Sequence, residues 1–307
     1  LKNSKNFFKS KNVNLAEQMC HKINSKQDKN VIIEIHNRPY LIDIIDKLVK
    51  SKKLVLYFHN DPLEMKGSKN ISERKALLKK VDYIICVSEF IKKKFMHGLN
   101  ELTNKILVIH NGVDRKLKVI PRKKKKIIFV GRLVKEKGVH HFVKAISNVS
   151  RNFKNWEYCL IGSRYSKNIL FNDYSKQIIT SFQQIENSKY LGAISHEEVQ
   201  KIMRETSIIV VPSVWNEPFG LVIAEAMSNG IAIICSNSGG IPEIIGNNGL
   251  ILDQVNSNNI EKFLNLLMSN SSILREFQKK SWDGFRHTSY LSSTKIDYYR
   301  KNLSSLD

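Results

Sequence analysis

Short apolar runs alternate with amphipathic segments along most of this chain. In its first part the apolar runs lie at residues 31–35, 54–58, 83–87 and 106–109. Between them, apolar positions recur at helical spacing, most clearly at residues 41–50, 73–80 and 89–96. Strands that alternate with helices in this way predict a parallel sheet with crossover helices.

The same alternation begins again after a basic segment at residues 115–126, which we interpret as an interdomain linker. The expected strands of this second part lie at residues 127–131, 157–162, 188–191, 208–211, 231–235 and 249–252. From about residue 260 onward the pattern is helical. The sequence therefore predicts an α/β protein with two Rossmann-like domains, over residues 1–114 and 127–285, and a closing helix over residues 286–307.

The most informative segment follows the continuous apolar run at residues 207–213, which is typical of a buried parallel strand. Pro218 suits the first position of a helix, where its missing N–H group would be unpaired in any case. The N–H groups of Phe219, Gly220 and Leu221 would then point outward and, with the helix dipole, form an anion site. This site lies just past the carboxyl end of a strand, where open α/β sheets bind ligands.

Two carboxylates flank the expected anion site. Glu217 lies at its mouth, and Glu225 lies about two turns further along the helix. Neither should touch a phosphate, because like charges repel, but carboxylates accept hydrogen bonds from sugar hydroxyls. The combination predicts a ligand with both phosphate and sugar, which is a nucleotide-sugar. The alternative is a helix with an acidic start and one exposed Glu.

Two cations follow the first strand of the second part. Arg132 comes after a glycine at the strand's end, and Lys137 lies where a helix should begin. Arg can hold a diphosphate by its planar fork and Lys as a point charge, although a solvated basic turn is the alternative. Ser238-Gly239-Gly240 is either another close backbone approach near the nucleotide or a tight turn that needs positive φ.

These segments resemble the retaining glycosyltransferases of the GT-B fold, in the large family that includes sucrose, mannosyl and lipopolysaccharide-core transferases. Glu217 to Glu225 looks like the family's Glu-x7-Glu motif. The other segments that match in the same order are His36-Asn37, His59-Asn60-Asp61, Val87-Ser88-Glu89, Asn111-Gly112-Val113-Asp114, Gly131-Arg132-Leu133, Glu136-Lys137-Gly138 and Gly239-Gly240-Ile241-Pro242-Glu243. The resemblance covers most of the chain and implies two Rossmann-like domains that face each other across a cleft. The ordered set is specific for the family, but not for the sugar.

The resemblance also implies a role for each candidate residue. Arg132, Lys137 and the backbone at residues 219–221 would hold the leaving diphosphate. Glu225 would hold the ribose hydroxyls, and Glu217 would orient the donor sugar, which makes it a catalytic candidate. The departing phosphate would take the acceptor's proton, so no side chain need act as a nucleophile, and electrostatic stabilisation of the leaving group would dominate.

His59 directly follows the run at residues 54–58. The resemblance implies that it contacts the donor sugar and the reacting centre, so it is the second catalytic candidate. Many family members have Asp directly after this His, whereas here Asn60 precedes Asp61, which puts a His–Asp pair in doubt. His36 lies at an equivalent strand end, where a place lining the cleft and a purely structural place are both open.

The formal net charge of +22 is unevenly distributed. Residues 1–126 hold 30 Lys and Arg against 12 Asp and Glu, a net charge of +18, whereas residues 127–307 hold 20 against 16. This asymmetry predicts a polyanionic partner for the first half. An anionic membrane face, nucleic acid and a mere bias of composition are the possible explanations. Nothing resembles an aromatic stacking platform or a basic recognition helix, so we expect no nucleic acid.

We therefore expect a retaining hexosyltransferase that uses a nucleotide-diphosphate sugar, a UDP-sugar such as UDP-glucose. A basic first domain suits a glycan or glycolipid acceptor of the cell envelope, such as lipopolysaccharide core or a lipid-linked glycan. A sugar-phosphate or storage-glucan synthase, and an inactive fragment that retains only nucleotide binding, are the alternatives.

Other features bound the location and the cofactors. The four cysteines are expected as free thiols, and no apolar run approaches the ~20 residues that span a bilayer. No signal peptide is visible, so we expect a cytoplasmic protein, with peripheral contact to the inner face of the cytoplasmic membrane. No paired-Asp motif or His/Cys cluster has ligand spacing, so we expect neither a metal nor a cofactor.

The start of the chain departs from the family pattern. No glycine precedes Gly67 and no clear strand precedes Val31, whereas the family opens with a strand and a glycine-rich loop. We therefore expect an incomplete N-terminal, acceptor-side domain before the nucleotide-sugar-binding domain, and a naturally short domain is the alternative. In the family the closing helix crosses back to the first domain.

Overall fold

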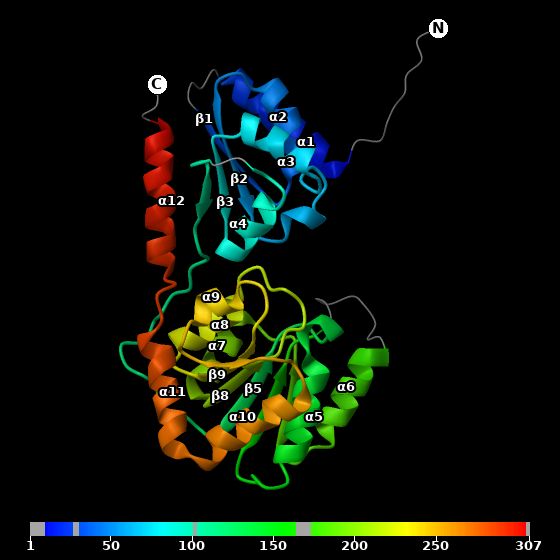
Figure 1. Ribbon diagram of the computed structural model, residues 1–307, viewed down its shortest axis with the longest axis vertical. Coiled ribbons are helices and arrows are strands. Elements are labelled where there is room, and N and C mark those ends of the chain that lie inside the picture. Colours follow the sequence, from blue (N-terminus) through cyan, green and yellow to red (C-terminus); the bar gives the residue numbers. More distant parts are fainter. Residues whose placement is uncertain (1–9, 27–30, 101–102, 164–172, 305–307) are drawn as a thin grey trace. The chain divides into compact units, whose positions relative to one another are not determined.

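The chain divides into two compact units. The computed structural model describes residues 10–26, 31–100, 103–163 and 173–304. Unit 1 comprises Leu1–His110 with Ser293–Asp307, and unit 2 comprises Asn111–Ser292. Both are α/β units with a parallel sheet, which confirms the predicted fold class of two Rossmann-like domains (Figure 1).

Unit 1 is built on a sheet of four parallel strands in the order β1-β2-β3-β4. The strands are β1 (Val31–His36), β2 (Lys52–Phe58), β3 (Tyr83–Cys86) and β4 (Ile106–Val108). The helices between and before them are α1 (Lys11–Ser25), α2 (Ile42–Leu48), α3 (Ile71–Lys80) and α4 (Glu89–Met96). Each predicted strand of this part is present, with ends that differ by one or two residues at most.

Local side chains explain where these helices begin. Asn70 and Glu73 form a capping box at the start of α3, because each side chain accepts a hydrogen bond from the other residue's backbone N–H. The Ser88 side chain accepts from the Ile91 N–H and caps α4. The segment Val87-Ser88-Glu89 is therefore a strand end followed by a helix cap.

The last helix, α12 (Ser289–Ser304), covers one face of the unit 1 sheet with its C-terminal half (Figure 1). Leu303 is buried against Val55, Tyr57 and Ile85, and Tyr299 packs at the same cluster. The chain's last described helix thus completes the core of the unit in which the chain begins.

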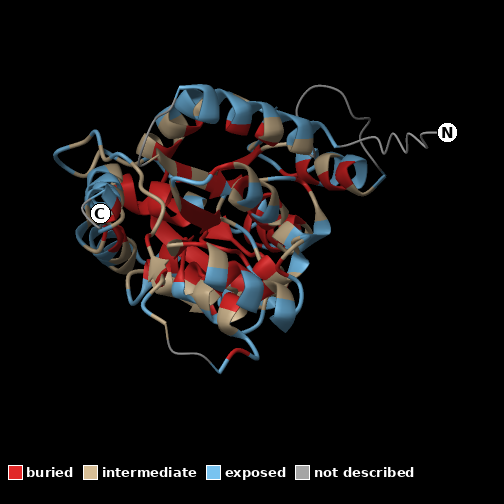
Figure 2. Ribbon diagram, turned by 90° about the horizontal axis from the view of Figure 1, so that it is seen from above, coloured by how far each residue is buried: buried red, intermediate tan, exposed pale blue. Residues whose placement is uncertain are grey.

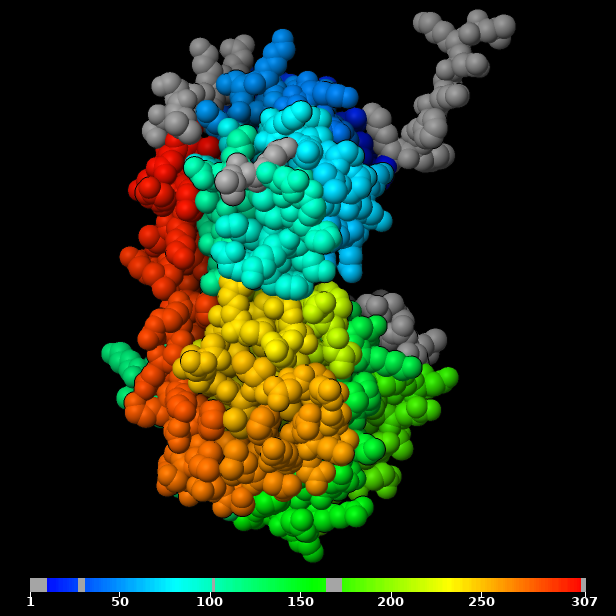
Figure 3. All heavy atoms as spheres, in the orientation of Figure 1, coloured from blue at the N-terminus to red at the C-terminus, as the bar shows by residue number. Residues whose placement is uncertain are grey.

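Unit 2 has a sheet of six parallel strands in the order β10-β9-β8-β5-β6-β7. The strands are β5 (Lys126–Val130), β6 (Glu157–Ile161), β7 (Ser188–Gly192), β8 (Ile208–Val211), β9 (Ala232–Ser236) and β10 (Leu250–Leu252). The helices are α5 (Val139–Val149), α6 (Asp173–Gln183), α7 (His196–Glu205), α8 (Leu221–Ser228), α9 (Ile241–Ile245), α10 (Ser257–Ser269) and α11 (Ser271–Asp283). Buried residues gather on the strands and exposed residues on the outer helix faces (Figure 2). On the outside of this unit, α10 and α11 lie side by side (Figure 3).

The strand order of unit 2 reverses between β5 and β8. From β5 the chain proceeds through β6 to β7 on one side, and from β8 through β9 to β10 on the other. Such a switch point opens a crevice at the carboxyl ends of the two strands, where doubly wound sheets bind their ligands. The loops after β5 and β8 carry the candidate cations and carboxylates.

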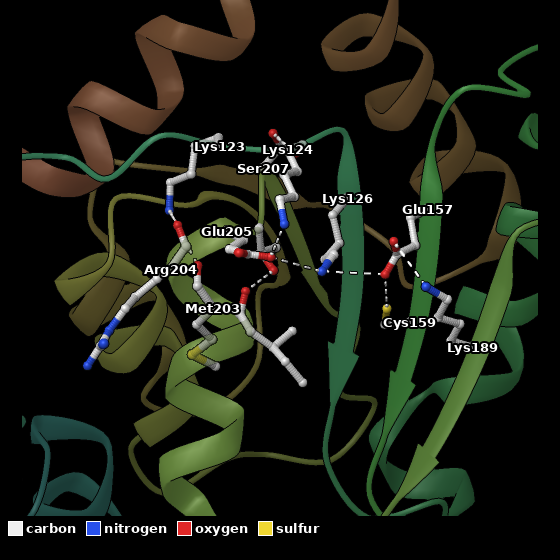
Figure 4. A network of polar contacts seen from close by, with 12 residues as sticks. Lys123, Lys124, Lys126, Glu157, Cys159, Lys189, Met203, Arg204, Glu205 and Ser207 are labelled. Atoms are coloured by element: carbon white, nitrogen blue, oxygen red, sulfur yellow. Dashed lines mark hydrogen bonds and ion pairs between the residues drawn. The ribbon is translucent and has the colours of Figure 1, made fainter.

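Three lysines of the predicted linker form side-chain contacts with other segments of unit 2 (Figure 4). The Lys123 Nζ donates to the carbonyls of Met203, Arg204 and Asn229 at 3.3, 3.0 and 2.8 Å, and burial lowers its pKa to about 7. Lys124 pairs with Glu205 at 2.8 Å.

Lys126 is buried as the first residue of β5, and its Nζ lies 3.4 Å from a Glu157 carboxylate oxygen. With Lys123 and Lys124 it forms part of one polar network within unit 2. These three lysines therefore fix the segment that enters β5.

This placement corrects the predicted charge asymmetry. Divided by units, Leu1–His110 with Ser293–Asp307 hold 25 Lys and Arg against 13 Asp and Glu, and Asn111–Ser292 hold 25 against 15. The net charges are thus +12 and +10. The excess that the sequence assigned to the first half came largely from the linker, which belongs to unit 2.

Candidate functional site

Helix α8 begins at Leu221, not at Pro218 as the sequence predicted. Gly220 is the N-cap and has a φ of 89°, a left-handed conformation that side-chain-bearing residues rarely adopt. This conformation separates Pro218 from the helix, so the proline lies in the preceding loop. The first-turn amides, which have no partner within the helix, are therefore those of Leu221 and Val222 rather than of Phe219.

Six of the predicted site residues line one cavity of about 360 Å³ in unit 2. They are Arg132, Lys137, Glu217, Gly220, Leu221 and Glu225. The cavity lies at the switch point between β5 and β8, next to the start of α8. Phe219 is not among the described residues that line it. Its side chain is buried, with the ring edge-on to His287 at a centroid distance of 5.8 Å.

Glu217 forms an ion pair with Lys137 inside this cavity. The Ser213 hydroxyl donates to the same carboxylate at 2.5 Å, and the Lys137 ammonium lies 5.5 Å from the centre of the Trp215 ring. Glu217 is only 8% exposed, so its charge is buried but paired. One cation therefore holds a carboxylate of the site while lining the space where an anion would bind.

The turn Ser238-Gly239-Gly240 supports the loop that carries Glu217. The Gly240 N–H donates to the Glu217 carbonyl at 2.7 Å, and the Ser238 hydroxyl donates to the Ser213 carbonyl at 3.0 Å. Gly239 has a φ of 60°, and a Cβ there would lie 2.2 Å from the Glu217 carbonyl oxygen. Of the two alternatives that the sequence left open, these contacts support the tight turn with positive φ.

Glu225 lies in the second turn of α8 and is 8% exposed. Burial raises the pKa of this carboxyl, and the opposing influence of His196, whose Nδ1 lies 3.6 Å from Oε1, is smaller. Glu225 and Leu221 also line a second cavity, of about 560 Å³, which includes His196 and Gln200.

His196 was not among the site residues predicted from the sequence. A signal for it exists, because Ser195 and Glu198 form a capping box directly after the strand end at Gly192. That box marks His196 as the first residue of a helix that starts at the ligand-binding edge of the sheet.

In unit 1, His59 follows the end of β2 and His36 ends β1. The Nδ1 of His36 lies 2.8 Å from the Nε2 of His59. Asp61 is engaged elsewhere, because its carboxylate accepts from the Leu63 N–H at 2.9 Å and lies 3.3 Å from the Lys94 Nζ. The partner of His59 is therefore His36, and the doubt about a His–Asp pair was justified.

The described residues contain no group of three or more His, Cys, Asp or Glu side chains placed to hold a metal ion. Over the same residues, each helix is too short or too polar to cross a bilayer.

Two Rossmann-like units and a cation-lined cavity at the switch point of the second are the architecture of a GT-B glycosyltransferase. Residues 112–281 match the family described as "Glycosyl transferases group 1", and residues 22–117 match "Glycosyltransferase Family 4". The first match alone covers more than half of the chain. The chain belongs to the group 1 glycosyltransferases.

Individual relatives agree with this family. The chain is 32% identical over 212 residues to the uncharacterized glycosyltransferase MJ1178 of Methanocaldococcus jannaschii, a match that covers 66% of this chain and 56% of that protein. A glycosyltransferase from Rickettsia africae has a similar fold, with a TM-score of 0.78, 18% identity and coverage of 100% of this chain and 84% of that one. Anabaena Alr3699/HepE, solved in complex with UDP-glucose, has a similar fold with a TM-score of 0.73 at 15% identity. The match covers 94% of this chain and 82% of that one. At these identities the two structures show the fold alone.

Proposed function

We propose that this protein transfers a sugar from a nucleotide-diphosphate sugar, a UDP-sugar, to a hydroxyl of a cell-envelope acceptor, with retention at the anomeric carbon. The observation that carries the proposal is the set of residues that line the cavity at the switch point. Two cations, a helix N-terminus and two buried carboxylates line a space of about 360 Å³. Phosphate, ribose and sugar hydroxyls are the ligand groups that this combination would bind.

The diphosphate is assigned to the cationic side of the cavity. Arg132 is exposed at the end of β5 and provides a fork of N–H donors, and Lys137 provides a compact charge. The first-turn amides of α8, at Leu221 and Val222, add donors and the positive end of the helix dipole. Together they would neutralise charge that grows on the leaving diphosphate.

The two carboxylates are assigned to hydroxyl groups. Glu225 lies inside the helix, beyond the first-turn amides, and is assigned to the ribose. Glu217 lies in the loop before α8, is already oriented by Lys137 and Ser213, and is assigned to the transferred sugar. Both carboxylates accept hydrogen bonds from hydroxyl groups, and the phosphates are assigned to the cations and the α8 amides instead.

The reaction follows from these assignments. The bond between the anomeric carbon and the diphosphate oxygen breaks, and a bond from the acceptor oxygen forms on the same face. The acceptor's proton passes to the departing phosphate oxygen. Stabilisation of the diphosphate by Arg132, Lys137 and α8 is the largest contribution to catalysis, since fixed charges in a partly buried site act without reorganisation. His59, at the carboxyl edge of the unit 1 sheet, is assigned to the sugar hydroxyls.

A glycan or glycolipid of the cell envelope, such as lipopolysaccharide core, is the proposed acceptor class. Both units are basic, and unit 1 carries its net +12 on fewer residues than unit 2 carries +10. Attraction to an anionic membrane face of about 1 kcal/mol per nearby Lys or Arg supports this class. Cosedimentation with anionic vesicles should exceed that with neutral vesicles and should fall with added salt. Equal binding to both kinds of vesicle would remove the membrane from the proposal.

Calorimetric titration of the full chain with UDP, GDP and ADP, and with their glucose conjugates, tests the donor assignment. The proposal expects saturable binding of UDP and UDP-glucose, with weaker binding of the other nucleotides. If none of these nucleotides binds, the proposed function is wrong.

A further inference from the structure

Two imidazole rings meet at the carboxyl edge of the unit 1 sheet. The parallel pairing of β1 with β2 places His36 opposite Tyr57, and His59 follows two residues after Tyr57. The His36 ring stacks on Tyr57 at a centroid distance of 4.3 Å and an angle of 14°, and on His59 at 5.1 Å and 12°. The Nδ1 of His36 and the Nε2 of His59 are 2.8 Å apart, which is hydrogen-bond distance.

The backbone around the pair is held in an uncommon conformation. Asn37 has a φ of 54°, in the left-handed region that Asn tolerates better than most residues. Its side-chain oxygen accepts from the His59 N–H at 2.8 Å, and its own N–H donates to the Tyr57 carbonyl at 2.9 Å. Asn37 therefore connects the end of β1 to the end of β2 and fixes the position of the His59 backbone.

The Tyr57 ring is anchored in turn. Its hydroxyl donates to Glu34 Oε1 at 2.9 Å, and Arg300 of α12 donates to both oxygens of Glu34, at 2.9 and 2.6 Å. Arg300 lowers the pKa of Glu34, and burial raises the pKa of Tyr57, so the tyrosine keeps its proton and the carboxylate its charge. A chain of contacts therefore runs from Arg300 of α12 through Glu34, Tyr57 and His36 to the Nε2 of His59.

Only one proton fits between the two histidines. One nitrogen must donate and the other must accept, so at least one ring is neutral while the bond exists. A proton on the accepting nitrogen would place two N–H donors face to face and would charge that ring, so it would break the bond.

Burial lowers the pKa of both rings, and the charge of His36 lowers that of His59 further. Around His36, Glu34 acts in the opposite direction and Arg300 in the same direction as burial. At neutral pH the two rings are therefore neutral and bonded.

We propose that His36 is a positioning residue for His59, which it holds in one orientation and one tautomer for the proposed sugar transfer. In a neutral His59 ring the Nδ1 takes the role opposite to that of Nε2, so the direction of the hydrogen bond to His36 sets whether Nδ1 donates or accepts. A sugar hydroxyl then meets a group of fixed role. A free imidazole would exchange tautomers and rotate. This inference rests on the proposed function for the role of His59, but the pairing itself does not.

Two variants separate the hydrogen bond from simple packing. His36→Phe keeps a ring that can stack on Tyr57 and removes the nitrogen. His36→Asn places an amide near the position of Nδ1, keeps a hydrogen bond to His59, and cannot titrate in this range. If His36 only packs, His36→Phe should behave more like the wild type than His36→Asn does. If His36 positions His59, His36→Asn should behave more like the wild type.

The test is nitrogen NMR of the full chain with ¹⁵N-labelled histidine, in which His59 is identified by its loss in His59→Gln. We expect the wild type and His36→Asn to show a single His59 tautomer at pH 7.5, and His36→Phe to show exchange between two tautomers. The same His59 spectrum in wild type and His36→Phe would overturn the pairing. This result is obtained whether or not the chain turns over a nucleotide-sugar.

Turnover of UDP-glucose, measured as release of UDP, tests the role in the reaction. We expect His36→Phe to lower kcat about 10- to 100-fold with little change in KM, the effect of a displaced reacting group, and His36→Asn to recover most of the loss. A full kcat in His36→Phe would overturn the positioning role, even if the NMR shows the pair. Absence of turnover in the wild type with every donor would instead count against the proposed function.

Discussion

The ammonium group of Lys137 is in contact with the carboxylate of Glu217, eighty positions further along the chain. One residue lies in the turn after β5 and the other in the loop after β8, the two strands that flank the switch point. In the proposed reaction one binds diphosphate and the other binds sugar. Their contact joins the proposed diphosphate site to the proposed sugar site. It also distinguishes the two cations, because Lys137 is paired with a buried carboxylate of the site.

This difference between the cations gives the first prediction. Arg132→Ala and Lys137→Ala should each weaken UDP binding by about 1.5–3 kcal/mol, the scale of hydrogen bonds to charged groups. Only Lys137→Ala should also lower the unfolding free energy, by about 1–3 kcal/mol, because it leaves the buried Glu217 without its cation. Calorimetry with UDP and urea unfolding measure the two effects. Unchanged UDP affinity in both variants would contradict the diphosphate assignment.

The two carboxylates should differ in which ligand they affect. Glu225→Ala should weaken binding of UDP and UDP-glucose alike, because ribose is present in both. Glu217→Ala should weaken UDP-glucose more than UDP, since only the former carries the sugar. Glu186→Ala, an exposed site away from the cavity, is the control. Equal losses for both ligands in Glu217→Ala would refute the division of roles.

Glu225 should also give stability a pH dependence. Burial raises the pKa of Glu225 in the folded protein above the ordinary value of 4.5. At a pH between 4.5 and the folded-state pKa, the folded protein therefore binds more protons than the unfolded chain. Its contribution to the unfolding free energy is therefore present at low pH and is lost as pH rises through the folded-state pKa.

The measurement is the difference in unfolding free energy between wild type and Glu225→Gln from pH 4.5 to 8. The wild type should lose stability relative to the variant as pH rises. A difference that is flat, or that changes in the opposite direction, would show that the carboxyl is ionised without penalty.

The Gly239 turn offers a matched pair of substitutions. Gly239→Ala would combine a φ of 60° with a Cβ 2.2 Å from the Glu217 carbonyl, so it should cost about 2–4 kcal/mol and weaken UDP-glucose binding. Gly192→Ala has nearly the same φ, 64°, but its Cβ would meet only the Tyr190 hydroxyl at 4.0 Å. It should cost about 1 kcal/mol, the price of the conformation alone. Urea unfolding of both variants is the measurement, and equal losses would show that Gly239 does not support the Glu217 loop.

The positions of the strands along the chain and the approximate place of the cavity were predictable, because apolar runs mark strands and ligand sites follow the carboxyl ends of parallel strands. Arg132 and Glu225 were found in this way. The start of α8 was misplaced because Pro218 fits a helix start locally, whereas the left-handed conformation of Gly220, next to Ile241 of a later segment, precedes the actual start.

Contacts between distant segments could not be predicted from local pattern. The hydrogen bonds of Lys123 to carbonyls at the ends of two helices are one example, and the contact between His36 and His59 is another. Both depend on side chains that meet only when the sheet is assembled. A basic run and two strand-end histidines carry no local sign of their partners.

The measurement that tests the central claim most directly is proton NMR of the anomeric signal during turnover of α-linked UDP-sugars and GDP-sugars by the full chain, with lipid-linked glycan acceptors. The account predicts that one donor is consumed and that the first product carries the sugar in the α configuration. It also predicts that Arg132→Ala slows the appearance of this signal at least about tenfold. A first product in the β configuration, or undiminished turnover by Arg132→Ala, would contradict it.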